Sequence, residues 1–559
     1  MYFNISEMLK YKIWPRPSPM RPRDLSRLAS RSYDVLVVGG GIHGLSCAYE
    51  AASRGLSVAL VEAGDFGSGI SFNHQKTAHG GLRALQSLSL GRARASIRER
   101  RALARMAPWL LRPLPFLAGT YRSLTRGRIA LRAGFVLDQR LGRHRNRDLE
   151  PELHLPRPRL LSRTATIKLF PGIREQGLTG GAQWYDYQMV ENDRLTFAFA
   201  AAADRAGAEL ANYASATSAI KAGSKVAGVQ IRDSLTGAEL EVTAQVIVNA
   251  AGAAAGSVLG MLGGSRRFPL LKAMNLVTRK RAADMALAAP GPDGRMLTLV
   301  PWRGHAIVGT SQSTTATTTA VDERVETSEV ADFVRQANHA FPALQLSPEE
   351  ITLIHRGWVP AVARGKNGAV LLPESEVLDH ASEGVDRVVT IVGAKYTTAR
   401  QTAERTVSLI ARKLGKRVAR SRTATTILPG AGIADHEALA IEHARRLNLE
   451  VPLPVIQHLI TRYAETTPSV IDIMSAQPET AAPVAPDTST IGAEVVHVIR
   501  SESALRLSDI VLRRTTVGAA GHPGTATLQG CAAVAARELD WSPERTREEI
   551  ADVERVYER

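Results

Sequence analysis

The sequence predicts an α/β protein in which one parallel sheet is assembled from distant parts of the chain, with a helical region at its C-terminal end. Three segments support this prediction, because each reads as an apolar strand, a glycine turn and a helix start: residues 33–44, 246–256 and 388–400. From about Thr423 onward the patterns are helical and are separated by proline-rich linkers. A length of 559 residues is too great for a single core and agrees with several domains.

The first segment has the pattern of a dinucleotide-binding turn. A buried strand runs into a glycine-rich stretch in which Gly39 makes the turn, Gly41 lets the backbone approach a pyrophosphate and Gly44 lets the helix lie close to the sheet. The helix N-terminus then offers N–H groups and a positive dipole end to the phosphates. Glu62 ends a second apolar strand about twenty residues further on, where an acid binds ribose hydroxyls. The sequence therefore predicts a Rossmann-like domain.

The two later segments favour a flavin over a nicotinamide cofactor. A flavin held by separate parts of the chain needs contacts for its pyrophosphate, its ribityl or adenosine portion and its ring system, whereas a nicotinamide enzyme needs only the first segment. FAD is therefore the expected cofactor.

Composition narrows the classes of partner. The net charge of +16 and the pI near 10.1 favour anionic lipid headgroups, phosphorylated small molecules or nucleic acid. Nucleic acid is not expected, because the arginines between residues 92 and 112 lie along a helical stretch with few interleaved aromatic residues and no base-reading module. A solvated basic face and a patch that contacts an anionic membrane surface both remain open.

The compartment predicted from the sequence is the cytoplasm. Two cysteines, Cys47 and Cys531, supply neither a disulfide framework nor a metal cluster, and Cys47 is expected to be a packing residue. Residues 1–32 are basic and interrupted by prolines, which predicts a disordered arm rather than a secretory signal. The apolar run 244–264 is interpreted as a buried strand and a loop, so any membrane association would be peripheral, at the inner face.

Several motifs resemble a known family. They are spread from residue 33 to about residue 545 and resemble the flavin-linked glycerol-3-phosphate dehydrogenases, the membrane-associated type that passes electrons to quinone. The matching stretches are Gly64-Asp65-Phe66-Gly67-Ser68-Gly69, His79-Gly80-Gly81-Leu82-Arg83, residues 105–108, residues 181–195, Asn249-Ala250-Ala251-Gly252, Val300-Pro301-Trp302, Val308-Gly309-Thr310, Gly393-Ala394-Lys395-Tyr396-Thr397-Thr398 and residues 494–515.

The resemblance implies a β-sheet substrate domain of the D-amino-acid-oxidase type beside the Rossmann-like FAD-binding domain, and an α-helical C-terminal domain. The expected boundaries are a basic arm at 1–32, an oxidoreductase region at 33–420 and the helical domain at 421–559. Within the second region, FAD-binding segments at 33–108, 193–265 and 361–420 alternate with substrate segments at 109–192 and 266–360.

The chemistry implied by the resemblance is oxidation of a secondary alcohol to a ketone by hydride transfer to flavin N5. His79 suits the role of proton acceptor, Arg83 that of an anion-orienting group, and Lys395 places positive charge near the flavin N1/O2 edge. If their segment is helical, His79 and Arg83 share one helix face. The expected cofactor-binding residues are Gly39, Gly41, Gly44, Glu62, Ser71, Lys76, Gly252, Gly393, Thr397 and Thr398, and no metal is expected.

The substrate pocket departs from the family pattern. The tyrosine expected after Arg83 is Ala84, the expected histidine is Asn275, and the expected arginine of the phosphate-binding Gly-x-Arg-Pro motif is Val359. A guanidinium binds phosphate through a planar fork that valine lacks. Arg356 is close in sequence, but in a strand it would point to the opposite face. The predicted small-molecule substrate is therefore a polyol or polyol phosphate, not necessarily glycerol 3-phosphate, with Asn275, Arg356 and Val359 as candidate contacts.

Two other functions remain open from the sequence. One is an FAD-dependent amine or amino-acid oxidase of the same fold, and the other is a non-catalytic flavin-binding protein at a membrane surface. Quinone is the expected electron acceptor of the dehydrogenase, and a homodimer is a further expectation.

Overall fold

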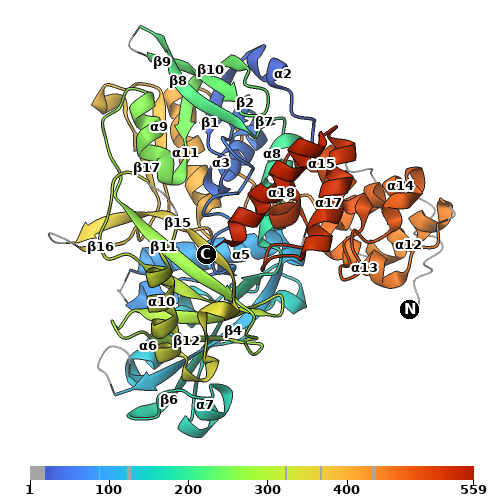
Figure 1. The fold of residues 1–559 in the computed structure, drawn as a ribbon. Coiled ribbons are helices and arrows are strands. Elements are labelled where there is room, and N and C mark those ends of the chain that lie inside the picture. Colours follow the sequence, from blue (N-terminus) through green and yellow to red (C-terminus); the bar gives the residue numbers. More distant parts are fainter. Residues whose placement is uncertain are drawn as a thin grey trace, which may run out of the picture.

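The fold has three parts, an upper lobe, a lower lobe and a helical domain beside them (Figure 1). The upper lobe carries the sheet that contains β1, the lower lobe carries a second sheet, and the helices α12 to α18 gather on the right. This computed structural model describes residues 19–86, 89–122, 127–223, 225–320, 324–364, 368–430, 436–447, 449–515 and 517–558.

The upper sheet confirms the predicted Rossmann-like arrangement. Its strand order is β17-β18-β10-β1-β2-β7, and β1 pairs in parallel with both β10 and β2. Because Val38 lies opposite both Val61 and Asn249, the three strands end at one edge of the sheet. The loops that follow them therefore lie side by side at this edge. The strands are β1 (Ser32–Val38), β2 (Val58–Val61), β7 (Glu209–Ala211), β10 (Glu239–Asn249), β17 (Glu376–Asp379) and β18 (Val388–Val392), and β8 (Ala214–Ala222) with β9 (Lys225–Asp233) extends β10.

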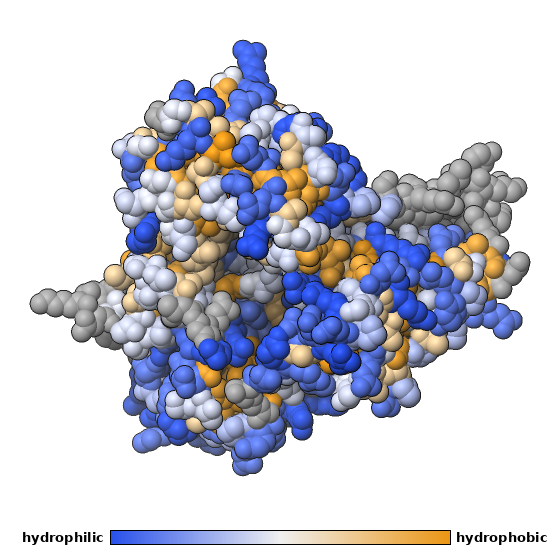
Figure 2. All heavy atoms as spheres, turned by 45° about the horizontal axis from the view of Figure 1, so that its top comes forward, coloured by the Kyte–Doolittle hydropathy of each residue, from blue (hydrophilic) through white to orange (hydrophobic). Residues whose placement is uncertain are grey.

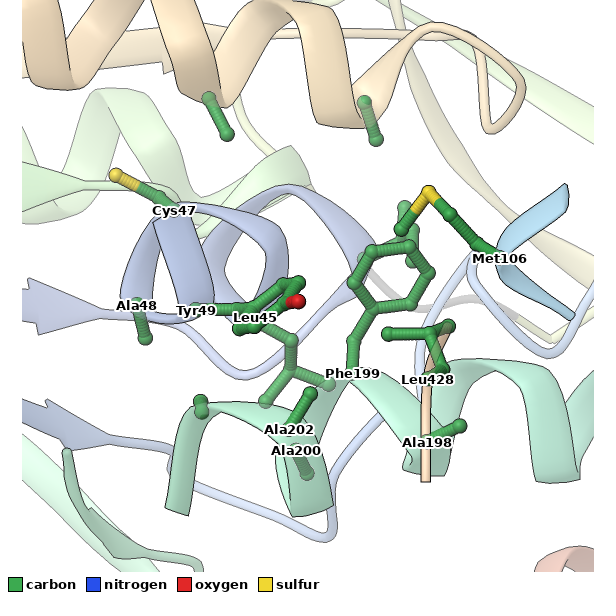
Figure 3. Close-up of a cluster of buried hydrophobic side chains, with 14 of the residues drawn as sticks. Leu45, Cys47, Ala48, Tyr49, Met106, Ala198, Phe199, Ala200, Ala202 and Leu428 are labelled. Atoms are coloured by element: carbon green, nitrogen blue, oxygen red, sulfur yellow. The ribbon is translucent and has the colours of Figure 1, made fainter. Parts of the chain in front are cut away.

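Helix α3 (Ile42–Ser53) packs against α8 (Asn192–Arg205) and α11 (Ala399–Leu414). Figure 3 shows the ring of Phe199 on α8 between α3 and the side chains of Met106 and Leu428. Cys47 points away from this ring and is fully buried, and burial raises the pKa of its thiol to about 12. Cys47 is therefore the packing residue that was expected, because an unionised thiol is a poor nucleophile.

The lower sheet has the order β16-β15-β11-β14-β13-β12-β4-β6-β3. Residues 111–116 lie in the strand β4, which pairs antiparallel with β6 and buries Leu114 and Phe116. This apolar stretch therefore belongs to the core of the lower lobe. The strands are β3 (Thr77–Ala78), β4 (Leu111–Tyr121), β6 (Leu178–Met189), β11 (Leu270–Thr278), β12 (Ala286–Pro290), β13 (Met296–Trp302), β14 (His305–Gln312), β15 (Ile351–Arg364) and β16 (Gly368–Leu371).

Helices lie against both lobes. In the lower lobe, α10 (Thr327–Ala340) supplies Phe333 and Ala337 to the core that contains Met274 and Leu276 of β11. The other helices of the two lobes are α2 (Leu25–Ala29), α4 (Leu82–Gln86), α5 (Leu90–Met106), α6 (Arg128–Leu141), α7 (Arg163–Leu169) and α9 (Ala255–Met261).

The N-terminal arm is ordered where the structure describes it. The prediction of a disordered arm is wrong for residues 19–31, which include α2 and bind acids of the upper lobe. Arg23 pairs with Asp233 at 2.7 Å, and Arg27 and Arg31 share Glu209. The basic residues of this segment are therefore held by specific carboxylates, while residues 1–18 lie outside the described residues.

The C-terminal domain is helical, as the sequence predicts. The Ser542 side chain accepts a hydrogen bond from the Arg545 N–H at the start of the last helix, as expected for its N-cap. The helices are α12 (His436–Arg446), α13 (Leu453–Tyr463), α14 (Thr467–Ala476), α15 (Gly492–Glu502), α16 (Leu507–Asp509), the π-helix η9 (Ile510–Arg514), α17 (Thr525–Glu538) and α18 (Pro543–Tyr557).

A buried ion-pair cluster fastens this domain to the loop that follows β2. Asp65 accepts hydrogen bonds from Arg513 Nε at 2.6 Å and from Arg514 Nη2 at 2.8 Å, and all three side chains are buried. Removing one partner of such a pair leaves a charge without compensation, which costs several kcal/mol.

Among the described residues, no helix has both the length and the apolar character needed to cross a bilayer.

Candidate active site

The glycine turn after β1 is closely packed. Gly39 has a φ of +112°, and a Cβ at this position would lie 2.6 Å from the Ala250 carbonyl oxygen. A Cβ at Gly44 would lie 1.8 Å from the Gly39 carbonyl oxygen, so only glycine lets α3 begin this close to the turn. The Ile42 N–H donates to Ser71 Oγ at 2.9 Å, which places Ser71 over the first turn of α3. A close glycine turn before a helix start is the geometry that pyrophosphate sites use.

Glu62 lies directly beside this turn, at the end of β2. Its Oε1 accepts from the Gly64 N–H at 2.8 Å and its Oε2 accepts from the Gly40 N–H. Burial raises the pKa of this carboxyl above its ordinary value, against the lowering effect of the two backbone donors. In dinucleotide-binding folds, an acid at the end of the second strand binds the ribose, and this role is the prediction for Glu62.

The third glycine segment meets the first at the same edge of the sheet. A Cβ at Gly393 would lie 2.4 Å from Nε2 of His43, which is in the first turn of α3. Thr397 Oγ1 accepts from the His79 N–H at 3.3 Å, and Thr398 is the N-cap residue of α11. In the sequence, Lys395 lies between Gly393 and Thr397, and its side chain is half-buried.

The second glycine segment leaves space at the same edge. Gly252 follows β10 with a φ of +58°, and no atom lies within 4 Å of a Cβ built there. A dinucleotide can therefore approach the backbone at this position. Figure 2 shows one face of the molecule, which is hollowed between the upper and lower lobes, with apolar side chains inside the hollow.

His79 is oriented by a buried carboxylate. Its Nδ1 lies 3.0 Å from Asp186 Oδ2, and its Nε2 lies 3.0 Å from Thr77 Oγ1. An ionised carboxylate only accepts hydrogen bonds, so Nδ1 carries the proton and Nε2 of the neutral ring accepts from the Thr77 hydroxyl. The His79 side chain is 53% exposed, which leaves the ring accessible to a substrate.

Asp186 remains charged although it is buried. Burial alone would raise its pKa, but the Arg100 guanidinium, His79 and the Gly80 N–H together lower the pKa below its ordinary value. Arg100 Nη1 donates to Asp186 Oδ1, and the Gly80 N–H donates to the same oxygen at 2.7 Å. A fixed negative charge therefore faces His79 Nδ1, where it stabilises a protonated imidazole.

Sequence reasoning missed Asp186, Arg100 and Thr77 as partners of His79. A signal for Arg100 was present, because it lies three residues after Ile97 and four before Ala104 on the buried side of α5. A charge on the buried face of an amphipathic helix indicates a buried partner.

Two expectations need correction. Helix α4 begins at Leu82, so His79 precedes it and does not share a helix face with Arg83, whose side chain lies outside the described residues. Lys76 is fully buried, with its ammonium 4.2 Å from the centroid of the Phe72 ring and 5.2 Å from that of the Trp302 ring. This enclosure argues against direct contact with a cofactor.

The candidate substrate residues lie on two faces of the lower sheet. In the β11–β15 ladder, Val359 pairs with Leu271, while Arg356 pairs with Met274. Because side chains alternate along a strand, Val359 shares a face with Asn275, and Arg356 points to the opposite face, as predicted. Asn275 Oδ1 accepts from Thr310 Oγ1 at 2.7 Å.

The surroundings of Val359 are apolar. It is buried in a cluster with Leu271, Ala273, Ala361 and Ile70. Val359 therefore lies in an apolar environment that offers no cation to a phosphate.

The fold and the site together define an FAD-dependent oxidoreductase. Residues 34–393 match the FAD dependent oxidoreductase family, and residues 421–546 match the C-terminal domain of alpha-glycerophosphate oxidase. A glycerol-3-phosphate dehydrogenase of Mycobacterium leprae is 31% identical over 548 residues, covering 96% of this chain and 91% of the relative. One of Synechocystis is 27% identical, covering 94% and 97%. The chain therefore belongs to the family of FAD-dependent glycerol-3-phosphate dehydrogenases.

Solved structures agree on the fold. The glycerol-3-phosphate dehydrogenase from Bacillus halodurans, complexed with FAD, has a TM-score of 0.72 at 22% identity and covers 95% of each chain. Glycine oxidase from Geobacillus kaustophilus has a TM-score of 0.51 at 22% identity, covering 72% of this chain and 100% of that one. The match over nearly the whole length includes the helical C-terminal domain, whereas the oxidase corresponds to a shorter part.

Proposed function

We propose that this protein oxidises a secondary alcohol of a polyol or polyol phosphate to the corresponding ketone. The observation that carries the proposal is the oriented pair of His79 and Asp186, joined through the His79 N–H to Thr397 of the third glycine segment. FAD, when bound, supplies the acceptor for the hydride that leaves the carbinol carbon. The three glycine segments and Glu62 are the residues that would hold it.

The residues have separate roles in this proposal. His79 takes the hydroxyl proton at Nε2, where the substrate hydroxyl replaces the hydrogen bond from Thr77. Asp186 holds the ring in the required tautomer and stabilises the positive charge that forms. Lys395 supplies positive charge at the electron-rich edge of the ring system, and Arg83 orients an anionic part of the substrate.

Anaerobic bleaching of the purified yellow protein tests this function. We expect polyols or polyol phosphates to bleach the flavin absorbance, and His79→Gln to slow bleaching by about 10²- to 10⁴-fold while the flavin remains bound. Bleaching by amines or amino acids alone would indicate an oxidase. Absence of bleaching by any of these compounds would indicate a non-catalytic flavin protein.

Val359, with its apolar neighbours, stands in place of the expected arginine and supports a substrate whose far end is not a tightly held phosphate. A charge-assisted hydrogen bond contributes about 1.5 to 3 kcal/mol, and valine offers none. We expect Val359→Arg to lower the KM for glycerol 3-phosphate relative to that for uncharged polyols, whereas Val362→Arg, at an exposed position of the same strand, should not. A wild-type preference for glycerol 3-phosphate over all uncharged polyols would contradict this part of the proposal.

Peripheral contact with an anionic membrane is supported by the outer face of α6. Ile129 is 88% exposed and Val136 is 46% exposed, and Arg132 and Arg140 lie on the same helix face. Apolar side chains flanked by arginines suit the headgroup region of an anionic bilayer. Quinone in that bilayer would then be the electron acceptor.

Vesicle sedimentation tests the membrane contact. The protein should sediment with phosphatidylglycerol vesicles more than with phosphatidylcholine vesicles, and Ile129→Glu should abolish the difference. Ile427→Glu, at an exposed apolar position outside α6, serves as the control. Equal recovery with both vesicle types would contradict the proposal.

The rate of flavin reoxidation by a ubiquinone analogue, compared with the rate by oxygen, would identify the electron acceptor. The homodimer stays a prediction, which sedimentation velocity would test.

A further inference from the structure

A cavity of about 60 Å³ lies where the C-terminal domain meets the upper lobe. Its lining includes Arg194 and Arg205 of α8, Arg462 and Tyr463 of α13, and His497 and Glu502 of α15. None of these residues belongs to the active site described above. By volume the cavity has room for several waters or for one small oxyanion.

Arg462 lacks hydrogen-bond partners within the described part of the chain. Its side chain is 1% exposed, and Nε, Nη1 and Nη2 all lack a hydrogen-bond acceptor there. Its ion-pair contact is Glu191 Oε2, 3.3 Å from Nη1, an oxygen that already accepts a hydrogen bond from Arg303 Nη2. A buried guanidinium with five N–H donors and no acceptor is costly to maintain.

Two neighbouring groups share this lack of partners. The Tyr463 hydroxyl and both ring nitrogens of His497 also make no hydrogen bond among the described residues, and both side chains are buried; His497 Nε2 lies 3.6 Å from Glu502 Oε1, a longer ion-pair contact. Three buried side chains from two helices therefore line one small cavity and carry polar atoms without hydrogen bonds. Buried polar groups in native proteins normally have partners, so the cavity itself must supply them.

The acids that line the cavity already have cationic partners. Glu502 accepts from Arg194 Nη1. Glu465 accepts from Arg205 Nη2 at 2.5 Å, and Asp204 pairs with Arg21 at 2.8 Å. The polar atoms that make no hydrogen bond in the cavity are therefore mainly donors. A ligand rich in acceptor atoms satisfies them better than a cation or an apolar molecule does.

We propose that this cavity binds a small oxyanion of the phosphate type through Arg462, with Tyr463 and His497 as further donors. Guanidinium groups bind such oxygens through paired, charge-assisted hydrogen bonds. Because α13 and α15 belong to the C-terminal domain and α8 to the upper lobe, the bound anion stabilises their junction. Free phosphate and the phosphoryl group of a larger compound share this chemistry.

Calorimetric titration of the FAD-loaded protein with inorganic phosphate, at constant ionic strength maintained with chloride, tests the proposal. We expect one site, a thermal midpoint that rises with phosphate, and an unchanged flavin spectrum, because the cavity is separate from the active site. Methyl phosphate, titrated in parallel, distinguishes the two sources: binding of inorganic phosphate alone identifies the free ion, and binding of both identifies the phosphoryl group.

Single substitutions test which side chains bind the phosphate. Arg462→Gln should weaken phosphate binding at least tenfold, whereas Arg500→Gln, on an exposed arginine of α15 that pairs with Glu538, should bind like wild type. Tyr463→Phe removes one donor with little change in volume and should weaken binding less, which gives a second test if Arg462→Gln does not fold. Absence of a phosphate-dependent signal in the wild type, or equal binding by Arg462→Gln, would overturn the proposal.

Discussion

His79 and Asp186 are 107 residues apart in sequence, yet His79 Nδ1 lies 3.0 Å from Asp186 Oδ2. The strand pairing brings them together, because Ala78 of β3 lies opposite Tyr187 of β6. The contact fixes the tautomer of the imidazole, and Arg100 keeps the carboxylate ionised. A group that would accept a proton is thus paired with the charge that stabilises its protonated form.

Replacing Asp186 by asparagine tests this relationship. An amide can donate to Nδ1, so the ring is expected to adopt the other tautomer and flavin reduction to slow by about 10²- to 10⁴-fold with the flavin still bound. Stopped-flow bleaching under anaerobic conditions measures the rate. Asp138→Asn, which removes a different buried acid paired with Arg145, should leave the rate near that of wild type. Similar rates for both variants would contradict the assigned role of Asp186.

Replacing Lys395 by methionine should slow flavin reduction by about 10²-fold without releasing the flavin, because developing negative charge loses its cationic neighbour. The same variant should bind sulfite less tightly, a spectroscopic readout that does not depend on substrate. Lys413→Met, at a lysine of α11 that pairs with Asp379, is the matched control. An unchanged reduction rate in the Lys395 variant would refute its role.

Replacing Gly44 by alanine should prevent flavin binding. The new Cβ would lie 1.8 Å from the Gly39 carbonyl oxygen, so α3 must move away from the glycine turn. The purified variant should be colourless, whereas Gly91→Ala, with no atom within 4 Å of the new Cβ, should remain yellow. Absorbance at the flavin bands against protein concentration measures the difference. A fully yellow Gly44 variant would contradict the close approach.

The buried ammonium of Lys76 should make the stability of the protein depend on pH. Burial lowers the pKa of its ammonium to about 7, against an ordinary value of 10.5. Between these values the unfolded chain binds a proton that the folded chain has released, so this residue makes the free energy of unfolding rise with pH. Lys76→Met should therefore stabilise the protein more at pH 6 than at pH 9. Equal shifts in thermal midpoint at the two pH values would show that Lys76 does not titrate in this range.

The parts of the fold that local pattern determines were predictable. The apolar strands that became β1, β2, β10 and β18 and the glycine turn at Gly39 follow from the periodicity and the steric needs of a dinucleotide turn. The opposite orientation of Arg356 and Val359 follows from strand alternation alone.

The remaining features depend on long-range pairing. Nothing near His79 in the sequence indicates that Asp186 will lie beside it, since only the β3–β6 register brings them together. Residues 19–31 have the composition of a disordered segment, but distant acids such as Asp233 and Glu209 order it. The sequence places Lys76 among the expected cofactor-binding residues. Only the packing of Phe72 and Trp302 shows that its ammonium is enclosed.

The cluster of Asp65 with Arg513 and Arg514 links the helical domain to the dinucleotide lobe. A chain truncated near residue 420 would lose both guanidinium groups that neutralise Asp65, three residues after Glu62. The helical domain therefore stabilises more than its own core, because two of its arginines hold the loop between the dinucleotide strand β2 and the rest of the upper lobe. A substitution at either arginine should weaken both parts of the molecule at once.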